Sequence, residues 1–402
     1  MYNYKWRLTY SMKKTNPLLI LILALGVFGI ITTEMGIIGV LPQVTQRFHI
    51  STSQAGWLVS IFALVVAISG PFLVLLVSGI NRKAILLTAV LAFAISNIVY
   101  AYTTRFDVML IFRIIPAIVH PVFFSVALVT AAQLVPPDKS GKAVTKVFAG
   151  ITVGFAFGVP LTSFLAEKIS LEAAFLFGAV VSIIAFVGIL AWLPSMPVKE
   201  KMSYGKQLGI LRKPQLWLNI LTVIFIFAAM FSVYSYFAEY LGQVTDMNGS
   251  WISIMLMVFG IVMIFGNFIF GSLLHKSITK TVIIFLLLYA AVYLLAYYAG
   301  SYFIPMLIIV FLWGAVHSGG LIVSQAWLTT EAQEAPEFGN SLFVSFSNLG
   351  ITLGTSIGGW FISRLGIHQL IWSGMMFIVL AFLVILLKSK MTKSNAEKVN
   401  VH

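Results

Sequence analysis

The stretch GITVGFAFG at residues 150–158 is followed about 200 residues later by a close copy, GITLGTSIG at residues 350–358. The tripeptide QVT shows the same offset, at residues 43–45 and again at residues 243–245. This offset is half the length of the chain, which has 402 residues. A repeat at half the chain length predicts two similar halves, each a unit of the same structure.

The composition is that of a membrane protein. Of all residues, 60% are apolar and only 9% are charged, and the mean hydropathy is +1.01, whereas soluble domains carry about 25% charged residues. A net charge of +13 can indicate a nucleic-acid partner, but these charges stand in short loops between apolar runs, so we expect none. The chain has no cysteine and its six histidines lack metal-ligand spacing, so we expect no metal site and no cofactor.

Twelve apolar runs are long enough to cross a bilayer, for which about 20 residues are needed. The first run exceeds the core of a signal peptide, about 7–15 residues, so we expect it to be retained. The sequence predicts an all-α membrane protein of two six-helix bundles, residues 1–194 and 214–387, with a cytoplasmic linker at 195–213 and a cytoplasmic tail at 388–402. The expected spans are Pro17–Leu41, Gln54–Ser78, Ala84–Thr103, Val108–Leu134, Val144–Ala166, Glu172–Pro194, Pro214–Leu241, Ser250–Leu274, Thr281–Gly300, Phe303–Trp327, Phe338–Ser363 and Ile367–Leu387.

The basic residues predict the orientation, because the cytoplasmic loops of membrane proteins are enriched in Lys and Arg. Of the 25 Lys and Arg residues, 20 fall on the face that holds both termini and the linker, four fall on the opposite face, and Arg113 lies inside a span. We therefore expect a monomeric, multi-pass protein in the lipid bilayer of the bacterial cytoplasmic membrane, with both termini in the cytoplasm.

Glu34 is the one carboxylate well inside an expected span, where a charge costs about 2.5–3.5 kcal/mol on insertion scales. Burial favours the protonated form of a carboxyl group, which suits a residue that loads and releases a proton. Arg113 lies at the same depth in the fourth span, given the rise of about 1.5 Å per helical residue. We expect the two side chains to pair, in a coupling role or as a structural ion pair. Glu239, at the outer end of the seventh span, is expected to be solvated.

Further polar and aromatic residues are candidates for a cavity that both halves line. His120 follows Arg113 by two helical turns on the same face, and His317 stands at similar depth in the tenth span, with Gln325 two turns further on. Histidine titrates near physiological pH, so these residues are candidates for substrate contact or proton movement; the alternative is that each bonds a neighbouring helix. The aromatic candidates, which suit a flat or apolar substrate, are Phe124, Tyr234 and Trp313.

Both copies of the repeated stretch carry glycines at intervals of four residues. Such a face lets a neighbouring helix approach closely. We expect close helix packing there, and a gating surface if the packed faces move against each other. The residues concerned are Gly150, Gly154 and Gly158, followed by Pro160, and Gly350, Gly354 and Gly358.

These features resemble the major facilitator superfamily, and within it the bacterial drug–proton antiporter branch that includes arabinose, sugar and purine-nucleoside efflux permeases. The resemblance covers nearly the whole chain. One departure is SGINRK at residues 78–83, where the family usually has an Asp, so the gating role of that Asp does not carry over. The stretches that carry the resemblance are TTEMGIIGVLP (32–42), AGWLVS (55–60) with Gly70 and Pro71, the segment from Arg113 through LVPPD (134–138) to Pro160, and EAPEFGNS (334–341).

The resemblance implies a transporter, not an enzyme, whose first, fourth, seventh and tenth spans line a central cavity. It implies proton-coupled export of a small molecule such as a drug, sugar or nucleoside by alternating access. Glu34 would carry the proton and Arg113 would tune its proton affinity, while His120, His317 and Gln325 would contact the substrate or assist proton movement. The alternatives are import or facilitated uniport, and a non-transporting membrane sensor or assembly partner.

The orientation can be tested directly. A single cysteine placed in the 195–213 linker can be labelled without background from other cysteines, because the chain has none. We expect this cysteine to be protected from a membrane-impermeant thiol reagent in intact cells and labelled after the cells are opened, because the linker is expected in the cytoplasm. Labelling in intact cells would contradict the predicted orientation.

Overall fold

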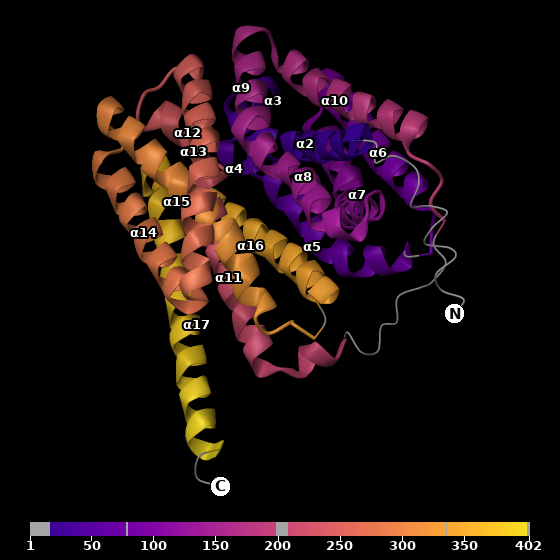
Figure 1. The fold of residues 1–402 in the computed structure, drawn as a ribbon. Coiled ribbons are helices and arrows are strands. Elements are labelled where there is room, and N and C mark those ends of the chain that lie inside the picture. Colours follow the sequence, from indigo (N-terminus) through magenta and orange to yellow (C-terminus); the bar gives the residue numbers. More distant parts are fainter. Residues whose placement is uncertain (1–16, 78, 198–207, 335, 400–402) are drawn as a thin grey trace.

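The computed structural model describes residues 17–77, 79–197, 208–334 and 336–399, and its regular structure within these ranges is helical throughout (Figure 1). The predicted all-α fold is confirmed. A helix suits a bilayer because it satisfies the peptide groups of the spanning segment internally.

The elements of the first half are α2 (Pro17–Gly39), α3 (Leu41–Phe48), α4 (Thr52–Ala55), α5 (Trp57–Leu76), α6 (Arg82–Tyr102), α7 (Phe106–Gln133), η1 (Pro137–Lys139), α8 (Ser140–Val153), η2 (Gly154–Gly158), α9 (Val159–Lys168) and α10 (Leu171–Trp192). Those of the second half are η3 (Leu208–Arg212), α11 (Pro214–Tyr234), α12 (Phe237–Gln243), α13 (Gly249–Lys276), α14 (Ile278–Ala299), α15 (Phe303–Thr329), α16 (Pro336–Leu365), η4 (Ile367–Gln369) and α17 (Leu370–Val399).

Eleven helices within the described ranges are long and apolar enough to cross a membrane. The run expected at Phe338–Ser363 forms α16, which is long but rich in Ser, Thr, Asn and Gly and is not among the eleven. The count of twelve spans therefore stays a prediction. Residues 1–16 and most of the predicted linker lie outside the described residues, whereas α17 continues past the last expected span as far as Val399.

The two halves lie on opposite sides of the molecule and meet along two pairs of helices, α5 with α16 and α9 with α13 (Figure 1). Small polar side chains line both contacts. The Ser356 hydroxyl donates to that of Ser60 at 3.2 Å, and the hydroxyls of Ser163 and Ser253 are 2.9 Å apart. Small residues suit such a contact because they let helix backbones approach closely while their hydroxyls bond across it.

The first long helix of each half is interrupted near the end of the molecule that we expect to face outward. In the first half, α2 stops at Gly39, and α3 begins with Pro42 at one of its first two positions, where its missing N–H costs nothing. In the second half, α11 stops at Tyr234 and α12 begins at Phe237. The short helices α3 and α12 contact each other, so this end of the molecule is closed by short segments from both halves.

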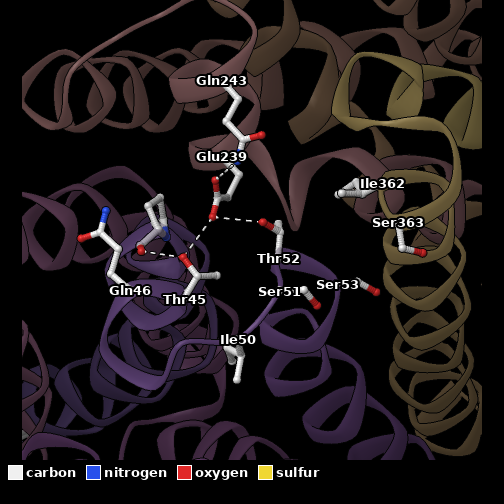
Figure 2. A pocket seen from close by; sticks show the side chains of 11 residues that line it. Thr45, Gln46, Ile50, Ser51, Thr52, Ser53, Glu239, Gln243, Ile362 and Ser363 are labelled. Carbon is white, nitrogen blue, oxygen red and sulfur yellow. Dashed lines mark hydrogen bonds between the residues drawn. The ribbon is translucent and has the colours of Figure 1, made fainter.

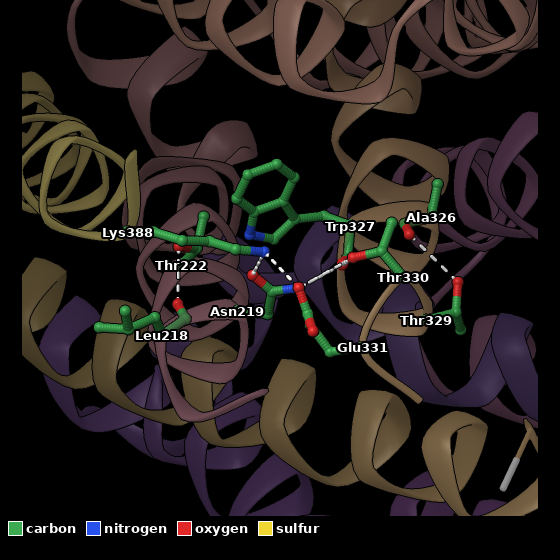
Figure 3. A network of polar contacts seen from close by, with 9 residues as sticks. All are labelled: Leu218, Asn219, Thr222, Ala326, Trp327, Thr329, Thr330, Glu331 and Lys388. Carbon is green, nitrogen blue, oxygen red and sulfur yellow. Dashed lines mark hydrogen bonds and ion pairs between the residues drawn. The ribbon is translucent and has the colours of Figure 1, made fainter. Parts of the chain in front are cut away.

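A polar network joins three helices of the second half near the start of α11 (Figure 3). The Lys388 ammonium on α17 donates to Asn219 Oδ1 on α11 at 2.7 Å, pairs with Glu331 Oε1 at 2.9 Å, and lies 4.4 Å from the centroid of the Trp327 ring. The Asn219 amide donates in turn to the carbonyl of Trp327 on α15 at 2.6 Å. The network fixes the start of α11 and the end of α15 against the middle of α17.

The two glycine sets pack helices within a half. A Cβ atom on Gly150 would lie 2.5 Å from the carbonyl oxygen of Ala24 on α2, and one on Gly350 would lie 2.5 Å from that of Ile224 on α11. The expected close packing is therefore present, but it joins helices of the same half, and the gating role stays a prediction. The other members, with equally close neighbours, are Gly154, Gly158, Gly354 and Gly358.

The first glycine set also contains a π-helical turn, η2, directly before Pro160 at the start of α9. Single π turns inside helices are rare and are often found at functional sites. One side of η2 packs on α2, and its other side faces the second half, where a Cβ atom on Gly260 of α13 would lie 2.6 Å from the Phe155 carbonyl oxygen. The turn therefore lies between the two halves.

The glycine packing can be tested with Gly354→Val. A Cβ atom on Gly354 would lie 2.8 Å from the Ala228 Cα atom, so valine must push α16 away from α11. We expect a loss of about 1–3 kcal/mol in stability, measured as a lower Tm of the purified protein. Gly271→Val is the matched control, because nothing lies within 4 Å of its Cβ position. Equal Tm values for the two variants would contradict the prediction.

Candidate proton and substrate site

Arg113 of α7 joins three helices of the first half. Its guanidinium donates to the main-chain carbonyls of Thr33 and Glu34 on α2 and of Leu58 on α5, each at 2.9 Å, and lies 4.6 Å from the centroid of the Phe62 ring. The residue is 1% exposed. The expected pairing with the Glu34 carboxylate is wrong, because the converging carbonyls satisfy the rigid fork of guanidinium donors.

Glu34 pairs with His120 instead. Its Oε2 atom lies 3.0 Å from His120 Nε2, and both residues are buried. The imidazole packs edge-on against Phe62 at 5.6 Å between ring centroids and lies tilted against Phe124 at 4.7 Å. These rings help to keep water from the pair, and a hydrogen bond in such a low-dielectric environment is stronger than in water.

The second half contains a related cluster around His317 of α15. The His317 Nδ1 atom lies 2.8 Å from the Tyr289 hydroxyl, which also accepts a bond from the Trp313 indole N–H at 2.9 Å. The Tyr234 ring packs on the imidazole at 4.7 Å between centroids and Phe259 packs edge-on at 5.2 Å. All five residues are buried. Three predicted site residues, His317, Tyr234 and Trp313, are thus brought together.

The two clusters share a histidine and a phenylalanine related by the internal repeat, and differ at the other positions. Each histidine packs edge-on against a phenylalanine from the second long helix of its own half, α5 or α13. Where the first half has Glu34, the repeat offset of about 200 residues leads to Tyr234 in the second half. At the position of the Tyr234 ring, the first half therefore holds a carboxylate that bonds the imidazole.

One ring nitrogen of each histidine is buried without a partner among the described residues, Nδ1 of His120 and Nε2 of His317. A buried polar atom without a hydrogen bond costs about 1–3 kcal/mol. Each atom therefore has the capacity for one further hydrogen bond, and the two atoms lie in different halves of the chain.

Two other candidates lie elsewhere. The Gln325 amide donates to Asn340 Oδ1 of α16 at 3.4 Å, and no described contact joins it to His317. Glu239 was expected to be solvated, and this is wrong: it is 5% exposed. The break before α12 explains the difference, because it lays the short helix against α3 instead of continuing α11 toward solvent.

Sequence reasoning missed Phe62, Phe259 and Tyr289. A signal for the first two was available, because they are 197 residues apart, the same spacing as His120 and His317. Tyr289 offered no comparable signal, since 14% of the chain is aromatic and its role depends on which way the α14 helix faces.

Two bundles of membrane-length helices, each with a buried polar cluster on its fourth long helix, are the architecture of a membrane transporter. The family model of the Major Facilitator Superfamily matches residues 23–285 and 252–400, and the chain belongs to this family. The family and fold expected from the sequence are thereby confirmed, and membrane transport, not enzyme catalysis, is the function of its relatives.

Two relatives and one solved structure illustrate the similarity. The chain is 31% identical over 352 residues to "Inner membrane transport protein YdhP" of Escherichia coli (strain K12), covering 88% of this chain and 90% of that protein. It is 25% identical to a "Probable sugar efflux transporter" of Helicobacter pylori (strain G27), with 89% and 91% covered. A bacterial homolog of the human lysosomal transporter Spinster, solved in an inward-facing and occupied conformation, shares the fold with a TM-score of 0.77 at 18% identity, with 92% and 96% covered.

The pairing at this site can be tested by double-mutant cycles on stability. Glu34→Gln combined with His120→Asn should be non-additive, with a coupling of about 0.5–3 kcal/mol, because the two side chains bond directly. Glu34→Gln combined with Arg113→Lys should be closer to additive, because Arg113 bonds only the main chain of Glu34. The measurement is thermal or denaturant unfolding of the purified variants. The opposite ranking of the two couplings would refute the assigned geometry.

Proposed function

We propose that this protein exports a small organic molecule, such as a drug, sugar or nucleoside, in exchange for protons, and that Glu34 carries the proton. The observation that supports this most is the bond between the Glu34 carboxylate and the His120 imidazole in a buried, aromatic-lined site. A carboxyl group in such a site changes the charge of a low-dielectric interior by one unit whenever it gains or loses a proton.

The change in charge supplies the coupling. Moving a charge between environments that solvate it differently changes its free energy by several kcal/mol, so protonation of the Glu34–His120 pair biases the equilibrium between two conformations of the halves. A ligand shifts such an equilibrium only through its different affinity for the two states. Proton binding in the first half and substrate binding near His317 would then be linked through the same conformational change.

The aromatic cluster in the second half supports a role in substrate contact. Tyr234 and Trp313 provide flat apolar faces, and the free nitrogen of His317 provides one polar contact. A few polar groups among aromatic side chains are typical of small-molecule sites. The similarity to a protein described as a sugar efflux transporter favours export and makes sugars the first compounds to test.

The test uses protein reconstituted into vesicles, with transport of labelled pentoses, hexoses and nucleosides measured with and without an imposed pH gradient. We expect gradient-driven accumulation by the unmodified protein. Glu34→Gln should abolish this accumulation and retain substrate exchange without a gradient, because glutamine keeps the size and hydrogen bonding of glutamate but does not ionise.

Glu334→Gln is the matched control, because the Glu334 side chain is 72% exposed and pairs with Lys213 at the surface; it should accumulate substrate normally. Accumulation by Glu34→Gln at the unmodified rate would refute the role of Glu34. If the unmodified protein transports substrate at a rate that does not depend on the pH gradient, the result would instead indicate facilitated uniport.

A further inference from the structure

A pocket with many polar side chains lies where the short helices α3, α4 and α12 of the two halves meet (Figure 2). Its volume is about 580 Å³, which is within the range of about 300–1,000 Å³ that is usual for small-molecule sites. Seven of its eleven lining residues carry hydroxyl or amide side chains. The lining residues are Pro42, Thr45, Gln46, Ile50, Ser51, Thr52, Ser53, Glu239, Gln243, Ile362 and Ser363.

Glu239 of α12 extends from the second half toward the first in this pocket (Figure 2). Its carboxylate accepts a hydrogen bond from Gln243 Nε2 at 2.7 Å, from Thr52 Oγ1 at 3.4 Å and from Thr45 Oγ1 at 3.5 Å. The two threonine bonds are at the long limit of hydrogen-bond geometry and are correspondingly weak. They are also the bonds that tie α12 to α3 and α4 of the other half.

The charge of Glu239 has no counter-charge in the wall of the pocket. Every other lining residue is a neutral Pro, Thr, Ser, Gln or Ile. A second cavity of about 240 Å³, which Glu239 also lines, adds the carboxylate of Glu167 and no basic side chain. The nearby Arg47 is already paired with Glu172 at 3.1 Å. The two cavities together thus hold two carboxylates and no basic side chain, in a chain whose net charge is +13.

From this arrangement we infer that the pocket binds a small, polar ammonium compound, with its ammonium group against Glu239 and its hydroxyl groups against the Ser, Thr and Gln side chains. A charge-assisted bond between an ammonium and a carboxylate is roughly twice as strong as a neutral one, so it can displace the long threonine bonds. The volume is far larger than a bare metal ion needs, which favours an amino sugar or an amino alcohol.

The inferred site is separate from the proposed proton and substrate site, since neither Glu34 nor His317 lines it. Its occupant would compete with Thr45 and Thr52 for Glu239, and would therefore loosen the hydrogen bonds that join α12 to these two hydroxyl groups of the first half. Binding in this pocket would favour separation of the two halves at this end.

The test measures thermal unfolding of the purified full-length protein with two matched pairs of probes, glucosamine with glucose and ethanolamine with ethylene glycol. A ligand that binds the folded state raises Tm with concentration. We expect both amines to raise Tm at millimolar concentration and both neutral partners to leave it unchanged. Glu239→Gln should lose the response, and Glu239→Asp should keep a weaker one, because it retains the charge on a shorter side chain.

Glu334→Gln, which makes the same substitution at an exposed position, should respond like the unmodified protein. Three results would overturn the inference: no rise with either amine, an equal rise with the neutral partners, or a full response in Glu239→Gln. A response that Glu34→Gln abolishes and Glu239→Gln retains would place the amine in the proton and substrate site instead. If Glu239→Gln does not fold, Glu239→Asp and the neutral probes still decide the question. The proposed transport function is tested through Glu34, so either proposal can fail alone.

Discussion

The buried guanidinium of Arg113 is the constraint on which the first half depends. A charged group buried in protein must find partners for its donors, and Arg113 finds three in main-chain carbonyls of α2 and α5. These bonds fix the rotation of α2 about its own axis. With that rotation set, the Glu34 side chain meets His120, and the titratable pair follows from a contact that does not involve the Glu34 carboxylate.

Much of the fold could be predicted from the sequence. The lengths of the apolar runs predict the membrane spans, and the repeat at half the chain length predicts the two halves. The depth of Glu34 and Arg113 was also predictable from the helical rise. Their pairing was not, since depth says nothing about the direction a side chain takes around the helix. The burial of Glu239 was missed for a related reason. The helix is interrupted at residues 235 and 236, and neither residue is a proline or a glycine that would have predicted the break.

The two buried carboxylates of the described chain, Glu34 and Glu239, have different surroundings. Glu34 bonds an imidazole of its own half. Glu239 bonds only hydroxyl and amide groups, two of them from the other half. The first arrangement suits proton transfer, and the second suits recognition of a cation and attachment between the halves. A buried glutamate thus suits a different role according to the hydrogen-bond donors that surround it.

The contact between η2 and Gly260 has a consequence for how closely the halves approach. Backbone meets backbone there, since a Cβ atom on Gly260 would lie 2.4 Å from the Ala156 Cα atom and 2.6 Å from the Phe155 carbonyl oxygen. A residue without a side chain is needed for this approach, and beside it the Phe155 ring packs against the Tyr234 ring of the second half, with 6.3 Å between centroids. An added methyl group on Gly260 would overlap the backbone of η2 and would hold α13 and η2 apart, so one missing side chain sets the spacing between the two halves at this contact.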